Sequence, residues 1–130
     1  MLLDTSGLLC LHHRAETQHA QAIAAYRAVR ARLTHNYVLA EFVAVANARQ
    51  LPRSAVLEFL ADLLENPEIE TVWVSESLHR EAMALLAARP DKTCSLCDTV
   101  SIILMRRRNI DDALTTDRHF EQEGFRRLLT

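Results

Sequence analysis

The hydrophobic positions of this chain recur at two spacings, which divide it into short strands and longer helices. Helical spacing of apolar residues and alanines marks residues 16–32, and further helices are predicted over residues 37–49, 76–88 and 95–108. Pro52 and the pair Asn66-Pro67 bracket another helix over residues 53–65. Short apolar or β-branched runs between them predict strands at residues 1–3, 33–35, 69–74 and 113–115. A short helix over residues 119–123 and a terminal strand over residues 127–129 complete the predicted order.

Strands and helices alternate along the chain, which favours a parallel sheet whose crossover connections are helices. We therefore expect an α/β fold, a three-layer α/β/α sandwich around a short, mainly parallel sheet. The chain has 130 residues and no linker rich in Gly, Ser or Pro, so residues 1–130 are expected to form a single domain. In such sheets ligands bind at the carboxyl ends of the strands.

The composition is that of an ordinary globular protein, with 49% hydrophobic and 25% charged residues. The apolar runs are far shorter than the roughly 18 residues that a membrane span needs, and the amino terminus lacks the basic segment of a signal peptide. Three cysteines suit reduced thiols better than a disulfide framework. We expect a cytoplasmic protein with no membrane-spanning segment.

The net charge of −2 gives no general attraction for a polyanion, so any such substrate must be bound locally. Fourteen of the fifteen basic residues are Arg and only Lys92 is Lys. The guanidinium group matches phosphate well, although a bias toward Arg also arises from the codon usage of a GC-rich genome. The basic residues gather at Arg27, Arg30 and Arg32, at Arg49 and Arg53, at residues 106–108, and at Arg126 and Arg127.

Four acidic residues stand out by position. Asp4 and Asp117 directly follow predicted strands, where each alone could also cap the next helix. Glu41 has only apolar residues three and four positions away and no basic residue near it, which indicates a partly buried carboxylate that needs a partner. Asp98 fits a capping box with Ser95 at the start of an apolar helix.

A parallel sheet can bring these four carboxylates to one edge, where they would repel one another strongly. Divalent cations would neutralise such a cluster, and Mg²⁺ or Mn²⁺ prefers carboxylate and water oxygens. The chemistry that this arrangement favours is the metal-assisted hydrolysis of a phosphodiester bond.

Four motifs carry a resemblance to a known family. In chain order they are Leu3-Asp4-Thr5-Ser6, Leu39-Ala40-Glu41, residues 95–99 (Ser-Leu-Cys-Asp-Thr) and residues 114–120 (Leu-Thr-Thr-Asp-Arg-His-Phe). With this order and chain length, the sequence resembles the PIN-domain nucleases, in particular the VapC-like toxins of prokaryotic toxin–antitoxin pairs.

The resemblance implies an endoribonuclease dependent on Mg²⁺ or Mn²⁺ that leaves a 5′-phosphate and a 3′-hydroxyl. It implies that the acids bind the metal, that the Thr115 hydroxyl assists the site or its water, and that Thr5 and Ser6 orient Asp4. It also implies RNA as the substrate and a small antitoxin protein as a partner. The catalytic residues would then be Asp4, Glu41, Asp98, Thr115 and Asp117, with the four acids as metal ligands.

A second hypothesis is a non-catalytic PIN-like module whose acidic edge binds a partner protein or RNA. A phosphatase of the haloacid type would need an Asp where Ser6 stands, and a phospho-acceptor receiver domain would need a lysine late in the sheet. The apolar face of residues 56–64 predicts surface for a homodimer or for an antitoxin. We further predict that Trp73 is a core residue, that His35 has a surface or capping role, and that His119 lies on a helix surface or contacts RNA.

Overall fold

The computed structural model describes all 130 residues and places five strands in one sheet. The strands are β1 (Leu2–Leu3), β2 (Arg32–His35), β3 (Ile69–Val72), β4 (Asp112–Leu114) and β5 (Arg126–Arg127). Their order is β3-β2-β1-β4-β5, and every neighbouring pair is parallel. The expected parallel sheet is confirmed, and the carboxyl ends of all strands therefore lie at one edge.

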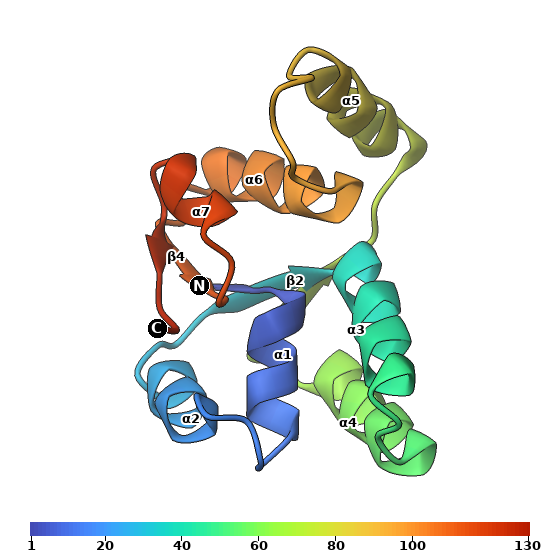
Figure 1. Cartoon of the computed structure of the whole chain (residues 1–130), viewed down its shortest axis with the longest axis vertical. Helices are drawn as coiled ribbons and strands as arrows, with labels where there is room; N and C mark the ends of the chain where they lie inside the picture. The colour runs from blue at the N-terminus through green and yellow to red at the C-terminus, as the bar shows by residue number, and fades with distance from the viewer.

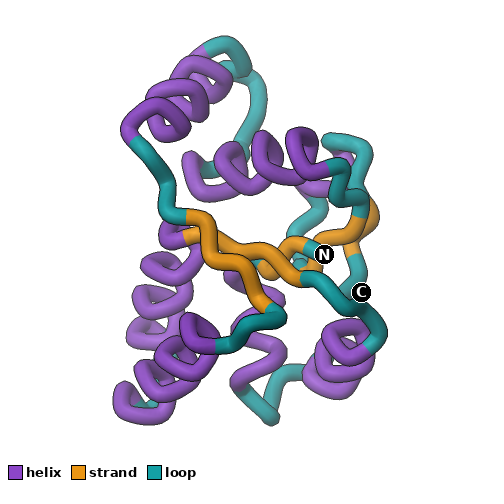
Figure 2. Tube along the Cα trace, turned by 180° about the vertical axis from the view of Figure 1, so that it is seen from behind, coloured by secondary structure: helices purple, strands orange, loops and turns teal.

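Helices cover both faces of this sheet (Figure 1). One face carries α1 (Thr5–His12), α2 (His19–Arg27), α3 (Asn36–Ala48) and α4 (Arg53–Glu65), and the other carries α5 (Glu76–Ala87), α6 (Leu96–Arg108) and α7 (His119–Gln122). Seen from behind, the strands again lie between the two groups of helices, so the three-layer sandwich is confirmed (Figure 2). The longest helices have 13 residues, and none is long and apolar enough to cross a bilayer.

The strands are apolar on both faces because each face packs against helices. Successive side chains of a strand point to opposite sides, so Leu3 joins a core of 16 buried residues on the side of α1 to α4, and Leu2 joins a core of 10 on the other side. Leu114 and Ala113 of β4 divide in the same way. The central strands β1 and β4 are therefore packed against helices on both faces of the sheet.

The predicted helix over residues 16–32 is too long at both ends. Residues 13–18 form turns, and α2 ends at Arg27. Arg32 belongs to β2 and is buried; its guanidinium lies over the ring of Tyr26 and donates to the carbonyls of Tyr26 and Val29. An Arg side chain that takes the free carbonyls after a helix stabilises that helix end. Arg32 is consequently a structural residue and not part of a phosphate-binding cluster.

Two further predictions were wrong. Trp73 is 66% exposed, because β3 is an edge strand that ends at Val72 and leaves the residue after it outside the core. His35 takes the N-cap position of α3, but its side chain makes no capping hydrogen bond and is fully buried. Its Nε2 is 2.8 Å from the hydroxyl of Ser101, and burial lowers its pKa to about 4.

Gly7 allows α1 to lie against the backbone of β4. A Cβ at this position would stand 2.0 Å from the carbonyl oxygen of Leu114, which is a backbone atom that cannot move aside. The distance between the first turn of α1 and the segment after β4 therefore depends on this glycine. Both segments contribute side chains to the candidate site.

We predict that Gly7→Ala lowers the free energy of unfolding by at least about 2 kcal/mol, because α1 and β4 must separate. Gly124→Ala is the control: Gly124 has a φ of +91° and open space around it, so only roughly 1 kcal/mol of backbone strain is expected. Urea unfolding of both variants measures the two values, and equal losses would contradict the close approach of α1 to β4.

Candidate active site

A cleft of about 510 Å³ opens at the carboxyl ends of the strands, between α1 and α3 on one side and the start of α6 on the other. All four acids predicted from the sequence line it, although they come from four separate segments of the chain. The complete lining is Asp4, Thr5, Ser6, Leu9, Glu41, Val45, Arg49, Ser95, Asp98, Thr116 and Asp117.

Asp4 lies deepest in this cleft. It follows β1 directly and is only 4% exposed. Its backbone takes the N-cap position of α1, but its side chain makes no capping hydrogen bond. Its Oδ2 accepts a 2.7 Å hydrogen bond from the Thr115 hydroxyl, while Oδ1 is buried and has no partner. Burial first, and then the nearby Asp98 and Glu41, raise the pKa of Asp4 to about 7, although the Thr115 hydrogen bond acts in the opposite direction.

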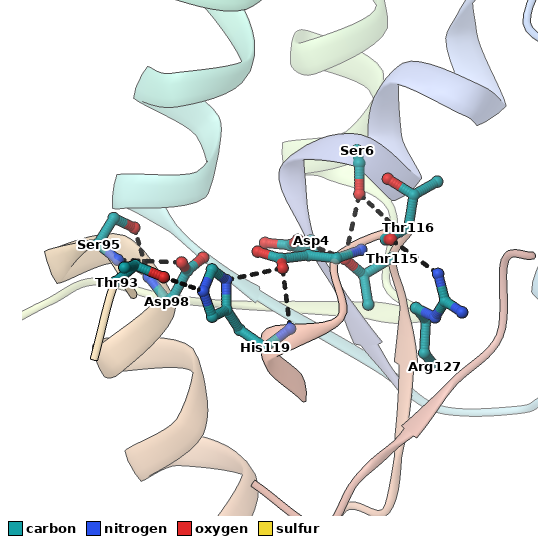
Figure 3. A network of polar contacts seen from close by, with 10 residues as sticks. Asp4, Ser6, Thr93, Ser95, Asp98, Thr115, Thr116, His119 and Arg127 are labelled. Carbon is teal, nitrogen blue, oxygen red and sulfur yellow. Dashed lines mark hydrogen bonds and ion pairs between the residues drawn. The ribbon is translucent and has the colours of Figure 1, made fainter. Parts of the chain in front are cut away.

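Two hydroxyl groups tie the start of α1 to the segment after β4 (Figure 3). The Ser6 hydroxyl lies 3.1 Å from that of Thr115 and accepts a hydrogen bond from the Thr116 amide. Thr115 Oγ1 also accepts the amide of Asp117 at 3.0 Å. From the other side, Arg127 donates to the Thr116 carbonyl. Ser6 thus acts on Asp4 through Thr115, whereas the Thr5 hydroxyl is buried without a partner.

Asp98 serves as a helix cap and also faces the cleft. Its Oδ2 accepts the Ser95 amide at 3.0 Å, and the Ser95 hydroxyl accepts the Asp98 amide at 3.1 Å, which completes the predicted capping box. Burial, with Asp117 and Glu41 nearby, raises the pKa of Asp98, while Ser95 opposes this shift. The cap fixes one carboxylate oxygen at the helix and leaves the other for the cleft.

Asp117 is joined to His119 at the start of α7. Its Oδ1 accepts the His119 amide at 2.9 Å and lies 2.8 Å from His119 Nδ1. His119 Nε2 is in turn 2.6 Å from the hydroxyl of Thr93, in the connection between α5 and α6 (Figure 3). Ligand atoms of Asp98, Asp117 and His119 lie within 4.8 Å of one another. His119 therefore belongs to the cluster, and the His two residues after Asp117 was the available sequence signal.

Glu41 extends the cluster from the opposite wall. It lies on α3 and is half-buried, as the apolar positions around it predicted. Its charge contributes to the raised pKa values of Asp4 and Asp98. No basic residue pairs with it, so its carboxylate is free to act in the cleft.

The residues present fit a hard divalent cation. Four carboxylates face one cleft, and a buried oxygen of Asp4 has no protein partner, which costs free energy unless a cation or donor satisfies it. Burial and the neighbouring acids raise the pKa values of Asp4 and Asp98, and no basic side chain opposes these shifts. A donor set made mainly of carboxylate oxygens suits Mg²⁺, Ca²⁺ or Mn²⁺.

Two comparisons with known proteins bear on the fold. A model of the PIN-domain family matches residues 1–125. The crystal structure of VapC20 from Mycobacterium tuberculosis, a toxin that cleaves the sarcin-ricin loop, has the same fold, with a TM-score of 0.88 and 23% sequence identity. The match covers 99% of this chain and 98% of that chain. A search of curated protein sequences gave no match.

The raised pKa of Asp4 predicts a specific dependence of stability on pH. Its pKa in the folded state is about 7, against 3.8 as the ordinary value, so in the absence of metal the stability falls as the pH rises from about 4 to 7. Asp4→Asn carries no such charge. Its advantage in stability over the wild type should grow by roughly 2–3 kcal/mol between about pH 5 and 8.

Urea unfolding in EDTA at these two pH values measures this difference. The Asn side chain still accepts the Thr115 hydrogen bond, so the comparison isolates the charge. An advantage that is the same at both pH values would contradict the raised pKa.

Proposed function

The chain belongs to the PIN-domain family, and on that premise we propose that it is a metal-dependent endoribonuclease, the toxin of a toxin–antitoxin pair. One observation carries the proposal. Four carboxylates from β1, α3, α6 and the segment after β4 converge on one cleft, and the most buried of them keeps an oxygen without a partner. A cluster of this kind has little structural use without a cation.

The metal ligands in this proposal are Asp4, Glu41, Asp98 and Asp117, with Mg²⁺ or Mn²⁺ as the ion. When bound, the cation offsets the negative charge of the carboxylates and of the scissile phosphate, and it makes water a better nucleophile at neutral pH. The Thr115 hydroxyl fixes Asp4 by donating to Oδ2, which leaves Oδ1 to the ion. His119 fixes Asp117 in the same way, because it occupies Oδ1 and leaves the other carboxylate oxygen free.

RNA as the substrate and toxin activity as the biological role are supported by the likeness to VapC20, which cleaves the sarcin-ricin loop. The cleft is open and lined mostly by polar residues, as the extended backbone of an RNA strand requires. The RNA that this chain cleaves is set by contacts beyond the acidic cluster.

A toxin of this class would be held inactive by a small antitoxin. The apolar face predicted over residues 56–64 is partly open: Leu57 and Leu64 are about half exposed, and Phe59 and Leu63 line a groove of about 310 Å³ beside α1 and α2. A small open reading frame next to the coding sequence, whose product co-purifies with this chain and inhibits its cleavage of RNA, is the expected observation.

We predict that the purified chain cleaves RNA with Mn²⁺ or Mg²⁺ but not in EDTA, and that Asp98→Asn lowers the rate by at least about 100-fold. Asn keeps an oxygen that can accept the Ser95 amide, so the capping box and the melting temperature should be preserved while a charged ligand is lost. Cleavage is followed with a labelled RNA on denaturing gels.

Asp111→Asn is the matched control, because Asp111 is an exposed acid at the opposite end of β4 from the cleft. It should cleave like the wild type. Full activity of Asp98→Asn would contradict the proposed metal site. If the wild type cleaves no RNA under any condition, after removal of any bound partner, the non-catalytic binding module is favoured instead.

A further inference from the structure

Most of the positive charge of this chain is neutralised by its own acids. Nine of the fourteen arginines form ion pairs within the chain. The basic end of α6 is a clear case: Arg106 pairs with Glu123, Arg107 with Glu81 and Arg108 with Glu70. Arg126 and Arg127 of β5 pair with Asp112 and Glu121. The Arg clusters at these places are therefore poor candidates for binding RNA phosphates.

Six basic side chains have no acidic partner, and most of them lie away from the acidic cleft. Arg14 follows α1, which leads about 12 Å away from the cleft over its eight residues. Arg27 lines the apolar groove, and Arg30 precedes β2 at the amino ends of the strands. Arg53, the first residue of α4, donates a hydrogen bond to Asn47 of α3. Only Lys92 and Arg118 remain.

Lys92 and Arg118 each precede one member of a pair of residues that meets beside the acidic cluster, although 25 residues separate them in the sequence. Arg118 lies between Asp117 and His119, which hydrogen-bond to each other. Lys92 precedes Thr93, whose hydroxyl is 2.6 Å from His119 Nε2. Figure 3 shows Thr93 and His119 side by side, next to Asp98. Both basic residues are exposed, so their charged groups are accessible to solvent.

We propose that Lys92 and Arg118 are the residues that bind the RNA backbone, by contacting phosphates next to the scissile one. The proposal rests on the proposed ribonuclease function and adds its substrate-binding residues. A net charge of −2 and four clustered carboxylates repel an RNA strand, so binding needs cations close to the cleft. Phosphate contacts of this kind position a strand without reading its sequence.

The contact between Thr93 and His119 joins the two segments that carry Lys92 and Arg118. It holds the connection between α5 and α6 against the start of α7, and so keeps Lys92 within reach of the strand that Arg118 contacts. Arg49, at the other end of the cleft, is already paired with Glu16. The free positive charge of the cleft is consequently on the side of Asp117, and the RNA strand should be bound most strongly there.

The test compares two double variants that change the net charge equally. Lys92→Gln with Arg118→Gln removes the two cations that the proposal places on the RNA, and Arg107→Gln with Arg126→Gln removes two cations that are paired elsewhere. Binding of a fluorescent single-stranded RNA is measured by anisotropy in Ca²⁺ over a series of KCl concentrations. Cleavage of the same RNA in Mn²⁺ is measured in parallel.

The first double variant should bind roughly tenfold more weakly near 0.1 M salt, and its salt dependence should fall by about 1.4 in log–log slope, which is about 0.7 for each RNA phosphate that is no longer neutralised. The control should bind like the wild type. Equal losses of affinity in both double variants would show that only overall charge matters and would overturn the proposal. Unchanged binding by the first double variant, or no detectable binding by the wild type, would also overturn it. A wild type that binds with the expected slope but does not cleave would instead contradict the ribonuclease function alone.

Discussion

The buried carboxylate of Asp4 imposes the constraint on which the remainder of the site depends. It stands at the end of a central strand, almost out of contact with water, with one oxygen held by Thr115 and the other unsatisfied. A carboxylate in this position is costly to ionise. The fold tolerates it because β1 and β4 are packed from both faces, and because the close approach at Gly7 brings the segment after β4 near enough for Thr115 to donate.

Two of the other acids, Asp98 and Asp117, are each fixed by a contact that occupies one oxygen. Ser95 holds Asp98 through the capping box, and His119 holds Asp117. A local structural role and a role in the cleft are thus combined in the same side chain. The cap interpretation of Asp98 and its interpretation as a ligand are consequently not alternatives, since a carboxylate has two oxygens and the helix start uses one.

The distribution of charge separates the site from the remainder of the surface. Most of the arginines are neutralised by acids of the chain, and Glu123 alone takes two of them. Among the residues that line the cleft, the only basic one is Arg49, and Glu16 already neutralises it. This contrast, more than the net charge, is what marks the cleft as a place for a divalent cation and a phosphate.

Local patterns in the sequence were enough to place most elements. Pro52 and the pair Asn66-Pro67 bracket α4 at its observed bounds, and the capping box marks the start of α6. The pattern failed where a contact distant in sequence decided the outcome. The pattern places Arg32 in a helix because nothing local shows that its guanidinium is buried against Tyr26 and Val29. It places Trp73 in the core because the apolar residues of a strand do not show that the strand lies at the edge of the sheet.

The sequence by itself determined the class of fold and the four acids, because helix and strand periods and acids after strands are local properties of the chain. Only the tertiary structure decided which oxygens are free, that His119 joins the acids, and which of fifteen basic residues lack a partner. These depend on side chains up to 111 positions apart, as in the hydrogen bond of Thr115 with Asp4. The parallel sheet sets such pairs by strand order, and strand order is a property of the whole packed chain.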